Sequence, residues 1–187
     1  QIENKDISLN QIENKDISFF IGKNNFYDLI LDNPAKMREM FDTCRGKIRE
    51  GYYKQVMREI LTNPSSQYEM IYTLEKKEGK MKANSFSFID FPEDNNSAHI
   101  SLICSNPGWG TSTLRTSERL GRRMNKQVMK LDAISSAKGF YIDKMNYKTS
   151  SESEESSSHG GDDDCTPLVK GINETFEDLG SVIRSIQ

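Results

Sequence analysis

The feature that most constrains the fold is the stretch over residues 98–115, "AHISLICSNPGWGTSTLR". Its continuous apolar run, "AHISLIC" (98–104), predicts a strand buried on both faces. Residues 105–110, "SNPGWG", which we call the glycine turn, follow the strand, and a helix is predicted over residues 111–125. A strand that enters a helix through a glycine turn aims backbone N–H groups at phosphate oxygens. The stretch therefore predicts an anion site at a strand-to-helix junction.

The residues before this stretch predict a first strand and two helices. The strand is expected at residues 18–22, and the first helix begins with Asn33 as its N-cap and Pro34 at its first turn. Apolar residues recur in this helix at helical spacing, so Cys44 is expected in the core and not as a nucleophile. The second helix is expected over residues 53–61.

Alternation then replaces the helical period. Residues 67–91 alternate in their apolar parts around "KKEGK" and predict an antiparallel hairpin. Beyond the glycine turn and its helix, a strand is expected at residues 127–134, a short helix at 135–146 and a last strand at 166–172.

The chain is expected to form one domain over residues 18–172. Residues 1–17 hold two copies of "QIENKDIS" and predict a polar arm. The serine-rich and acidic tract over residues 150–164 is expected to be a disordered insertion, and residues 173–187 predict an amphipathic helix. Through that helix the protein could form a homodimer or bind a protein partner.

Charge and hydropathy exclude two classes of partner. The formal net charge is -3, and the tract holds six acidic residues and no basic one, so the rest of the chain is mildly positive. Such a body suits an anionic small ligand but lacks the basic stripe of a nucleic-acid binder. No apolar run approaches the roughly 18 to 20 residues that span a bilayer, and no signal-peptide profile is present, so no membrane association is expected.

The cysteines predict neither a metal site nor a disulfide framework. Cys44, Cys104 and Cys165 show no CxxC spacing and have no histidine nearby. We therefore expect a reducing compartment, the cytosol or the nucleus, and no metal.

The predicted order of elements resembles that of the GNAT-type N-acetyltransferases. That family marks its pyrophosphate loop with [Q/R]xxGx[G/A], which "SNPGWG" resembles, although Ser105 replaces Gln or Arg. A second segment, "MKLDAISSAKGFYIDKMNY" (129–147), is similar to the family's "LxAxxxAxxFYxKxGF". The resemblance covers about residues 18–172. It implies an α+β fold with a mixed, mostly antiparallel central sheet flanked by helices and a V-shaped splay between the fourth and fifth strands.

The resemblance also implies an activity and a cofactor. The protein would transfer an acetyl group from acetyl-CoA to a primary amine of a small molecule, peptide or protein by direct attack. Glycines would let the backbone approach the pyrophosphate, N–H groups at the helix start would bind it, and strand backbone would bind the pantetheine. The residues implied are Leu102, Ile103, Cys104, Gly108, Trp109, Gly110, Thr111 and Ser112. Basic residues of the following helix, Arg115, Arg119, Arg122 and Arg123, would lie near the adenosine phosphate or form a solvated face.

The proton donor to the leaving thiolate would be Tyr141, on the family's "FY" pair. This fit requires one extra residue before Lys144. Without that gap, Ile142 takes the position of the tyrosine and the donor is absent.

The general base is less well marked. His99 is our candidate, with Asp90 and Glu93 as alternatives. Cys104 as an acylated nucleophile is the weaker route. The alternative hypothesis is that the protein has the same fold, is catalytically impaired and has a binding or structural role.

Overall fold

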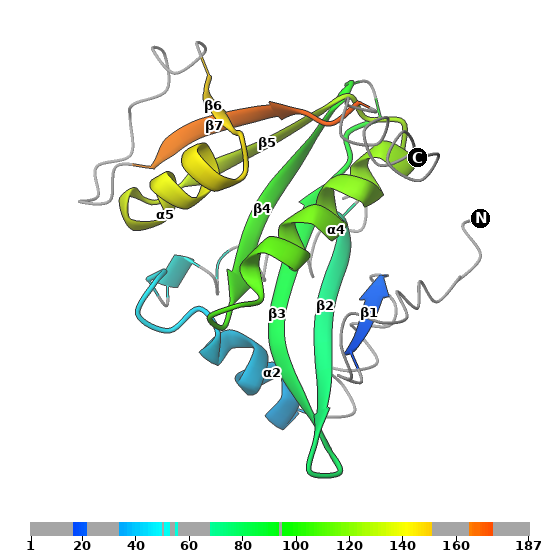
Figure 1. The fold of residues 1–187 in the computed structure, drawn as a ribbon, viewed down its shortest axis with the longest axis vertical. Helices are drawn as coiled ribbons and strands as arrows, with labels where there is room; N and C mark the ends of the chain where they lie inside the picture. Colours follow the sequence, from blue (N-terminus) through cyan, green and yellow to red (C-terminus); the bar gives the residue numbers. More distant parts are fainter. Residues whose placement is uncertain are drawn as a thin grey trace, which may run out of the picture. The chain divides into compact units, whose positions relative to one another are not determined.

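The computed structural model describes residues 17–21, 34–49, 51–52, 55, 68–93, 95–150 and 165–173. By their contacts the residues divide into two compact units. Figure 1 shows the helices and strands of both. The first unit contains the chain up to Asp90 together with Ile100–Ser117, and the second contains Phe91–His99 and the chain from Glu118 onward. The repeated arm, the acidic tract and the C-terminal segment lie almost entirely outside the described residues.

The strands of the first unit follow one another in the order β1-β2-β3-β4. They are β1 (Ile17–Ile21), β2 (Tyr68–Lys77), β3 (Lys80–Asp90) and the greater part of β4 (Ser97–Ser105). The predicted hairpin is confirmed, because β2 and β3 pair antiparallel with Lys77 opposite Lys80. Glu78 and Gly79 between them have φ values of 52° and 75°. Two left-handed residues match the right-handed twist of the flanking strands.

Helix α2 (Pro34–Asp42) begins at Pro34 as predicted, but it ends sooner than the helical pattern suggested. The chain continues as a turn over residues 43–47, in which Gly46 has φ 74°. A left-handed residue cannot continue a helix, and this explains the earlier end. Met40 and Cys44 are buried in one apolar cluster with Phe86 and Phe88 of β3.

Strand β4 differs from its prediction. Its side chains alternate between buried and half-buried, whereas we expected burial on both faces. Leu102 and Cys104 point into the core cluster, while His99 and Ile103 lie on the half-buried face. One face of β4 therefore remains accessible in part.

The second unit contains strands in the order β5-β7-β6. They are β5 (Val128–Ala133), β6 (Lys148–Thr149) and β7 (Thr166–Gly171), with α5 (Ser135–Gly139) and a π-helix, η1 (Phe140–Lys144). Both pairings are antiparallel. The strands at β5 and β7 were predicted, but the two exposed residues of β6 carry no apolar pattern that would announce a strand.

Helix α4 (Gly110–Arg123) begins in the first unit and ends in the second. Near its end, a Cβ atom on Gly121 would lie 2.6 Å from Cδ1 of Ile172 and 3.2 Å from Cε of Met129. Only glycine allows this close approach. The expected α+β class with antiparallel strands and flanking helices is confirmed; the splay between β4 and β5 stays a prediction. Within the described residues no helix is long and apolar enough to cross a membrane.

Candidate functional site

The glycine turn joins β4 to α4 in the predicted position. Gly108 has φ 87°, and a Cβ atom built on it would meet nothing within 4 Å, so the space beside this backbone is open. The N–H of Thr113 donates to the carbonyl of Trp109 at 3.2 Å, and the N–H groups of residues 110–112 precede this bond. N–H groups at a helix start, with the positive end of the helix dipole, bind anions. The open side of the turn therefore fits a phosphate group.

Two asparagines hold the start of the turn against β3. The N–H of Asn106 donates to the carbonyl of Asn84 at 2.7 Å, and the side-chain amide of Asn106 donates to Oδ1 of Asn84 at 3.0 Å. No local sequence pattern predicts this pair, because the two asparagines are 22 residues apart.

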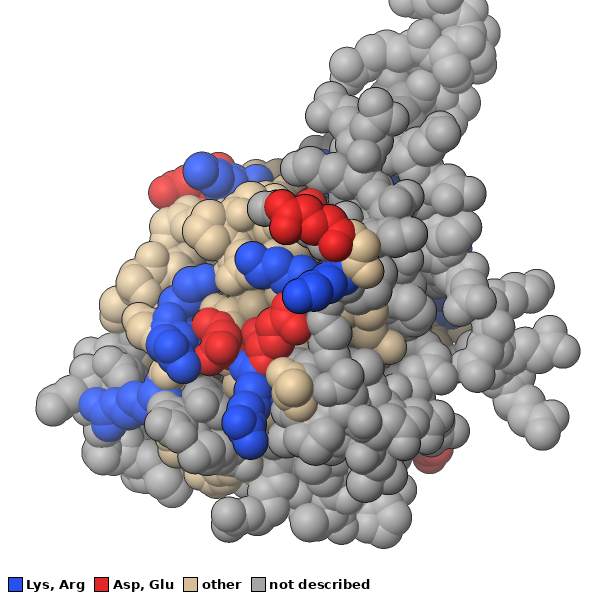
Figure 2. Space-filling view, turned by 90° about the horizontal axis from the view of Figure 1, so that it is seen from below, with Lys and Arg blue, Asp and Glu red and all other residues tan. Residues whose placement is uncertain are grey.

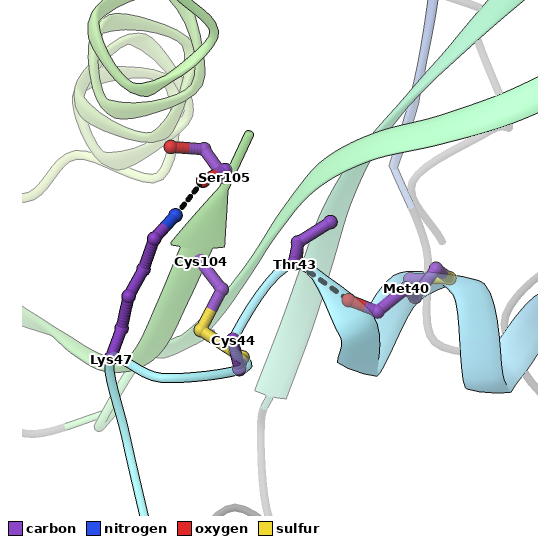
Figure 3. The surroundings of a disulfide bond; sticks show 6 residues. All are labelled: Met40, Thr43, Cys44, Lys47, Cys104 and Ser105. Atoms are coloured by element: carbon purple, nitrogen blue, oxygen red, sulfur yellow. Dashed lines mark hydrogen bonds between the residues drawn. A yellow bond between two sulfur atoms is a disulfide. The ribbon is translucent and has the colours of Figure 1, made fainter. Parts of the chain in front are cut away.

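A disulfide joins Cys44 to Cys104, which corrects our expectation of free thiols (Figure 3). The two cysteines are 60 residues apart. Spacing rules recognise cysteines that are close in sequence, whereas here the packing of the turn after α2 against the end of β4 brings the sulfurs together. Cys104 therefore cannot serve as an acylated nucleophile while the bond is intact, and the inference of a reducing compartment loses its basis.

The same turn makes a second contact with β4. Nζ of Lys47 donates to the carbonyl of Ser105, the first residue of the glycine turn (Figure 3). Lys47 is otherwise exposed.

Buried hydroxyl groups fix the first turns of α4 to the sheet. Oγ1 of Thr113 donates to Oγ of Ser85 at 2.6 Å, and Ser85 donates to Oγ1 of Thr73 at 2.7 Å. One helical turn later, Oγ of Ser117 donates to Oγ of Ser87 at 3.1 Å. The alternating pattern predicted this strand but not the contacts of Ser85 and Ser87, which lie on the face opposite the buried Phe86 and Phe88.

Of the strand residues expected to bind pantetheine, Leu102 and Cys104 have buried side chains. Only their backbone could meet a ligand. Ile103 is half-buried on the opposite face of β4 and could contribute its side chain as well.

In the second unit His99 faces Asp132 of β5. Nε2 of His99 lies 3.5 Å from Oδ2 of Asp132, with side-chain exposures of 41% and 51%. The hydrogen bond from His99 lowers the pKa of the Asp132 carboxyl, and burial opposes this effect in part. Sequence reasoning missed Asp132, because it appeared only as a polar position in an alternating strand. The other candidate bases, Asp90 and Glu93, are half-buried and exposed.

Tyr141 lies within the π-helix η1. A π-helix arises when one extra residue is inserted in an α-helix, and such insertions are frequent at functional sites. The extra residue that the Tyr141 fit requires falls at this place. Two residues beyond Lys144, Asn146 has φ 61°, a conformation that favours the glycine expected there. Burial raises the pKa of the Tyr141 hydroxyl to about 12, so it is protonated at neutral pH.

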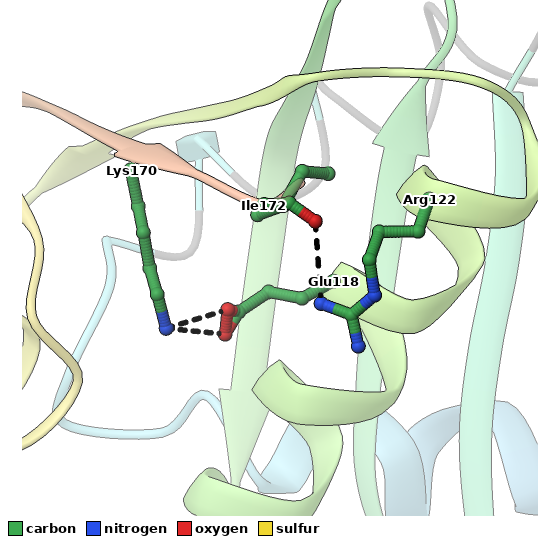
Figure 4. Close-up of polar contacts among 4 residues, drawn as sticks. All are labelled: Glu118, Arg122, Lys170 and Ile172. Carbon is green, nitrogen blue, oxygen red and sulfur yellow. Dashed lines mark hydrogen bonds and ion pairs between the residues drawn. The ribbon is translucent and has the colours of Figure 1, made fainter. Parts of the chain in front are cut away.

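A largely buried ion pair joins Lys170 to Glu118 (Figure 4). Nζ of Lys170 is 2.8 Å from Oε2 of Glu118 and 5.6 Å from the ring centroid of Tyr147. Rings of Tyr141 and Tyr147 meet edge to face with centroids 5.8 Å apart. Burial, followed by the charge of Glu118, raises the pKa of Tyr147, whose buried hydroxyl has no hydrogen-bond partner in the described part of the chain.

The arginines of α4 do not act as one group. Arg122 donates to the carbonyl of Ile172 at 3.5 Å (Figure 4), whereas Arg115, Arg119 and Arg123 are exposed. Among the described residues on the face seen in Figure 2, basic and acidic side chains lie next to one another.

Comparison with solved structures identifies the fold. An acetyltransferase from Streptococcus agalactiae matches with a TM-score of 0.58 and 13% identity over 83% of this chain and 98% of its own. A GNAT-family acetyltransferase from Staphylococcus aureus matches with a TM-score of 0.56 and 12% identity over 84% and 99%. The chain has the GNAT fold. The sequence matches no protein-family model and has no significant match among curated proteins.

In the GNAT fold expected from the sequence, the glycine turn lies between β4 and α4, as it does here. At these identities the likeness to solved structures shows the fold alone.

Proposed function

We propose that the protein is an acetyl-CoA-dependent N-acetyltransferase that acts on a primary amine of a small molecule or peptide by direct attack. The observation that carries this proposal is the glycine turn at the start of α4, with open space beside Gly108. Pyrophosphate is an anion that a helix N-terminus favours, and glycine lets it come close to the backbone.

The coenzyme would bind along the path from β4 to α4. The N–H groups of Gly110, Thr111 and Ser112 would hold the pyrophosphate, and the turn itself contributes no charged side chain. The backbone of Leu102, Ile103 and Cys104 would bind the pantetheine. Bound acetyl-CoA supplies an electrophilic thioester carbonyl and a thiolate leaving group.

His99 would accept the proton that the amine must lose. Its Nε2 faces Asp132, so in the neutral tautomer with hydrogen on Nε2 the lone pair is on Nδ1. The Asp132 carboxylate would fix this tautomer and stabilise the imidazolium that forms, without taking the proton itself.

Tyr141 would donate a proton from its hydroxyl to the departing sulfur. Its raised pKa keeps the donor protonated at neutral and mildly alkaline pH. Tyr141→Phe keeps the ring packing and removes the proton, so kcat should fall about 10²-fold with KM for acetyl-CoA little changed.

Titration calorimetry with acetyl-CoA tests the proposal directly. The wild-type protein should bind, and Gly108→Arg, which fills the open space beside the turn, should abolish binding while circular dichroism shows a folded chain. A screen of amine acceptors by thiol release would follow.

Binding without release on any amine would favour a catalytically impaired GNAT-fold binding protein. Failure of the folded wild-type protein to bind acetyl-CoA would overturn the proposal.

A further inference from the structure

The Cys44–Cys104 disulfide lies directly beside the proposed coenzyme site. Cys104 is the last residue before the glycine turn, and its backbone belongs to the strand segment proposed to bind pantetheine. Both cysteines are almost completely buried, with exposures of 0% and 3%. The bond therefore fixes the point at which the chain leaves the core and enters the turn.

The partner cysteine belongs to a hydrogen-bonded turn. The N–H groups of Lys47 and Ile48 donate to the carbonyl of Cys44 at 3.0 and 3.2 Å, so residues 44–48 form a closed turn. Lys47 of that turn donates to the carbonyl of Ser105. Two ties, one covalent and one a hydrogen bond, thus connect the turn at residues 44–48 to consecutive residues of β4 (Figure 3).

The opposite side of the glycine turn is held separately. Asn106 makes two hydrogen bonds with Asn84 of β3. If the ties at Cys104 and Ser105 are lost, the hydrogen bonds of Asn106 with Asn84 remain on one side of the turn, and the side that faces residues 44–48 is released. N–H groups bind an anion well only while their directions are fixed, because any reordering on binding costs free energy.

We propose that the Cys44–Cys104 disulfide is a positioning element of the coenzyme site and that its reduction weakens coenzyme binding. This inference rests on the proposed function. A dithiol would break the S–S bond by passing two electrons and two protons to it, which leaves thiols on Cys44 and Cys104 and converts the reductant to its own disulfide. Two thiols cannot approach as closely as bonded sulfurs, so reduction would let the end of β4 and the turn at residues 44–48 move apart.

The test compares oxidised and reduced wild-type protein by calorimetry with two probes. Acetyl-CoA carries the pyrophosphate, and S-acetylpantetheine lacks it. Reduction should raise the Kd for acetyl-CoA about tenfold and that for S-acetylpantetheine by a smaller factor, since Cys104 also belongs to the segment proposed to bind pantetheine. Counting of free thiols by mass after alkylation establishes the redox state, and re-oxidation should restore the original Kd.

Two variants keep the test decisive if the reduced chain unfolds. Lys47→Met removes the hydrogen-bond tie without entering the core, and it should raise the Kd for acetyl-CoA about threefold and not that for S-acetylpantetheine. Lys80→Met, an exposed lysine of the β2–β3 hairpin, is the matched control and should bind as wild type.

The outcomes separate the two proposals. If the oxidised, folded protein does not bind acetyl-CoA, the proposed function fails. If it binds, and a folded reduced protein binds equally well, the positioning role is wrong while the function stands. If reduction unfolds the chain and Lys47→Met binds both probes as wild type does, the positioning role is also wrong.

Discussion

The two units of the molecule differ in the buried contacts that stabilise each of them. In the first, the buried polar contacts of α4 are uncharged hydroxyl pairs, and a covalent bond ties the end of β4. In the second, the buried polar contact of α4 is the ion pair of Glu118 with Lys170. Reductant therefore acts on one unit, whereas removal of a charge acts on the other. A single helix, α4, is therefore stabilised by uncharged hydroxyl contacts in one unit and by an ion pair in the other.

The largest effect is expected from loss of the disulfide. The bond closes a loop of 60 residues, and the chain-entropy model gives such a loop about 4 kcal/mol of stabilisation. Urea unfolding of the oxidised and the reduced protein should differ by about this amount. A difference below about 1 kcal/mol would show that core packing alone holds these residues, and the contrast between the units would disappear.

The next effect is expected from breaking the buried ion pair. Lys170→Met keeps the apolar stem but leaves the carboxylate of Glu118, 4% exposed, without its cation. This should cost about 3 kcal/mol, because an unpaired buried charge is expensive. The measurement is urea unfolding of the single and double variants. Adding Glu118→Gln to Lys170→Met should recover most of the loss, and simple additivity of the two single losses would contradict the pairing.

The same residues show which parts of the fold and the site could be predicted from the sequence. The hairpin and the strands around the glycine turn followed from local periodicity, because alternation and glycine turns are properties of neighbouring residues. The fold class followed from the resemblance of the element order and of two motifs to the GNAT-type N-acetyltransferases. The disulfide and the pair of Glu118 with Lys170 join residues 60 and 52 positions apart, and no local pattern records such contacts. Asp132 was missed for the same reason, because only its contact with His99 of β4 marks it as a candidate site residue.

A smaller effect is expected from the hydroxyl contacts of α4. Thr113→Val preserves the shape of the side chain and removes the donor to Ser85, so the free energy of unfolding should fall by about 1 kcal/mol. Unlike the ion pair, this loss should not vary with salt. Thr111→Val, the same substitution at an exposed position of the same turn, is the control for stability. An equal loss in both variants would assign the cost to helix propensity and not to the buried contact.

The smallest effect is expected from the half-exposed pair of His99 and Asp132, and it tests whether charge in the second unit stabilises only where it is buried. The folded-state pKa of Asp132 lies below its unfolded value of about 3.9, so its contribution is present above that pH and is lost as the pH falls through the folded pKa. Solvent screening of a pair this exposed limits the contribution to about 0.5 kcal/mol. Asp132→Asn should therefore be less stable than wild type at pH 5 by this amount and equal to it at pH 2.5, and 1 M salt should remove the difference at pH 5. A difference that persists in high salt would mean that Asp132 acts through packing, and the distinction between buried and exposed pairs would then fail in this unit.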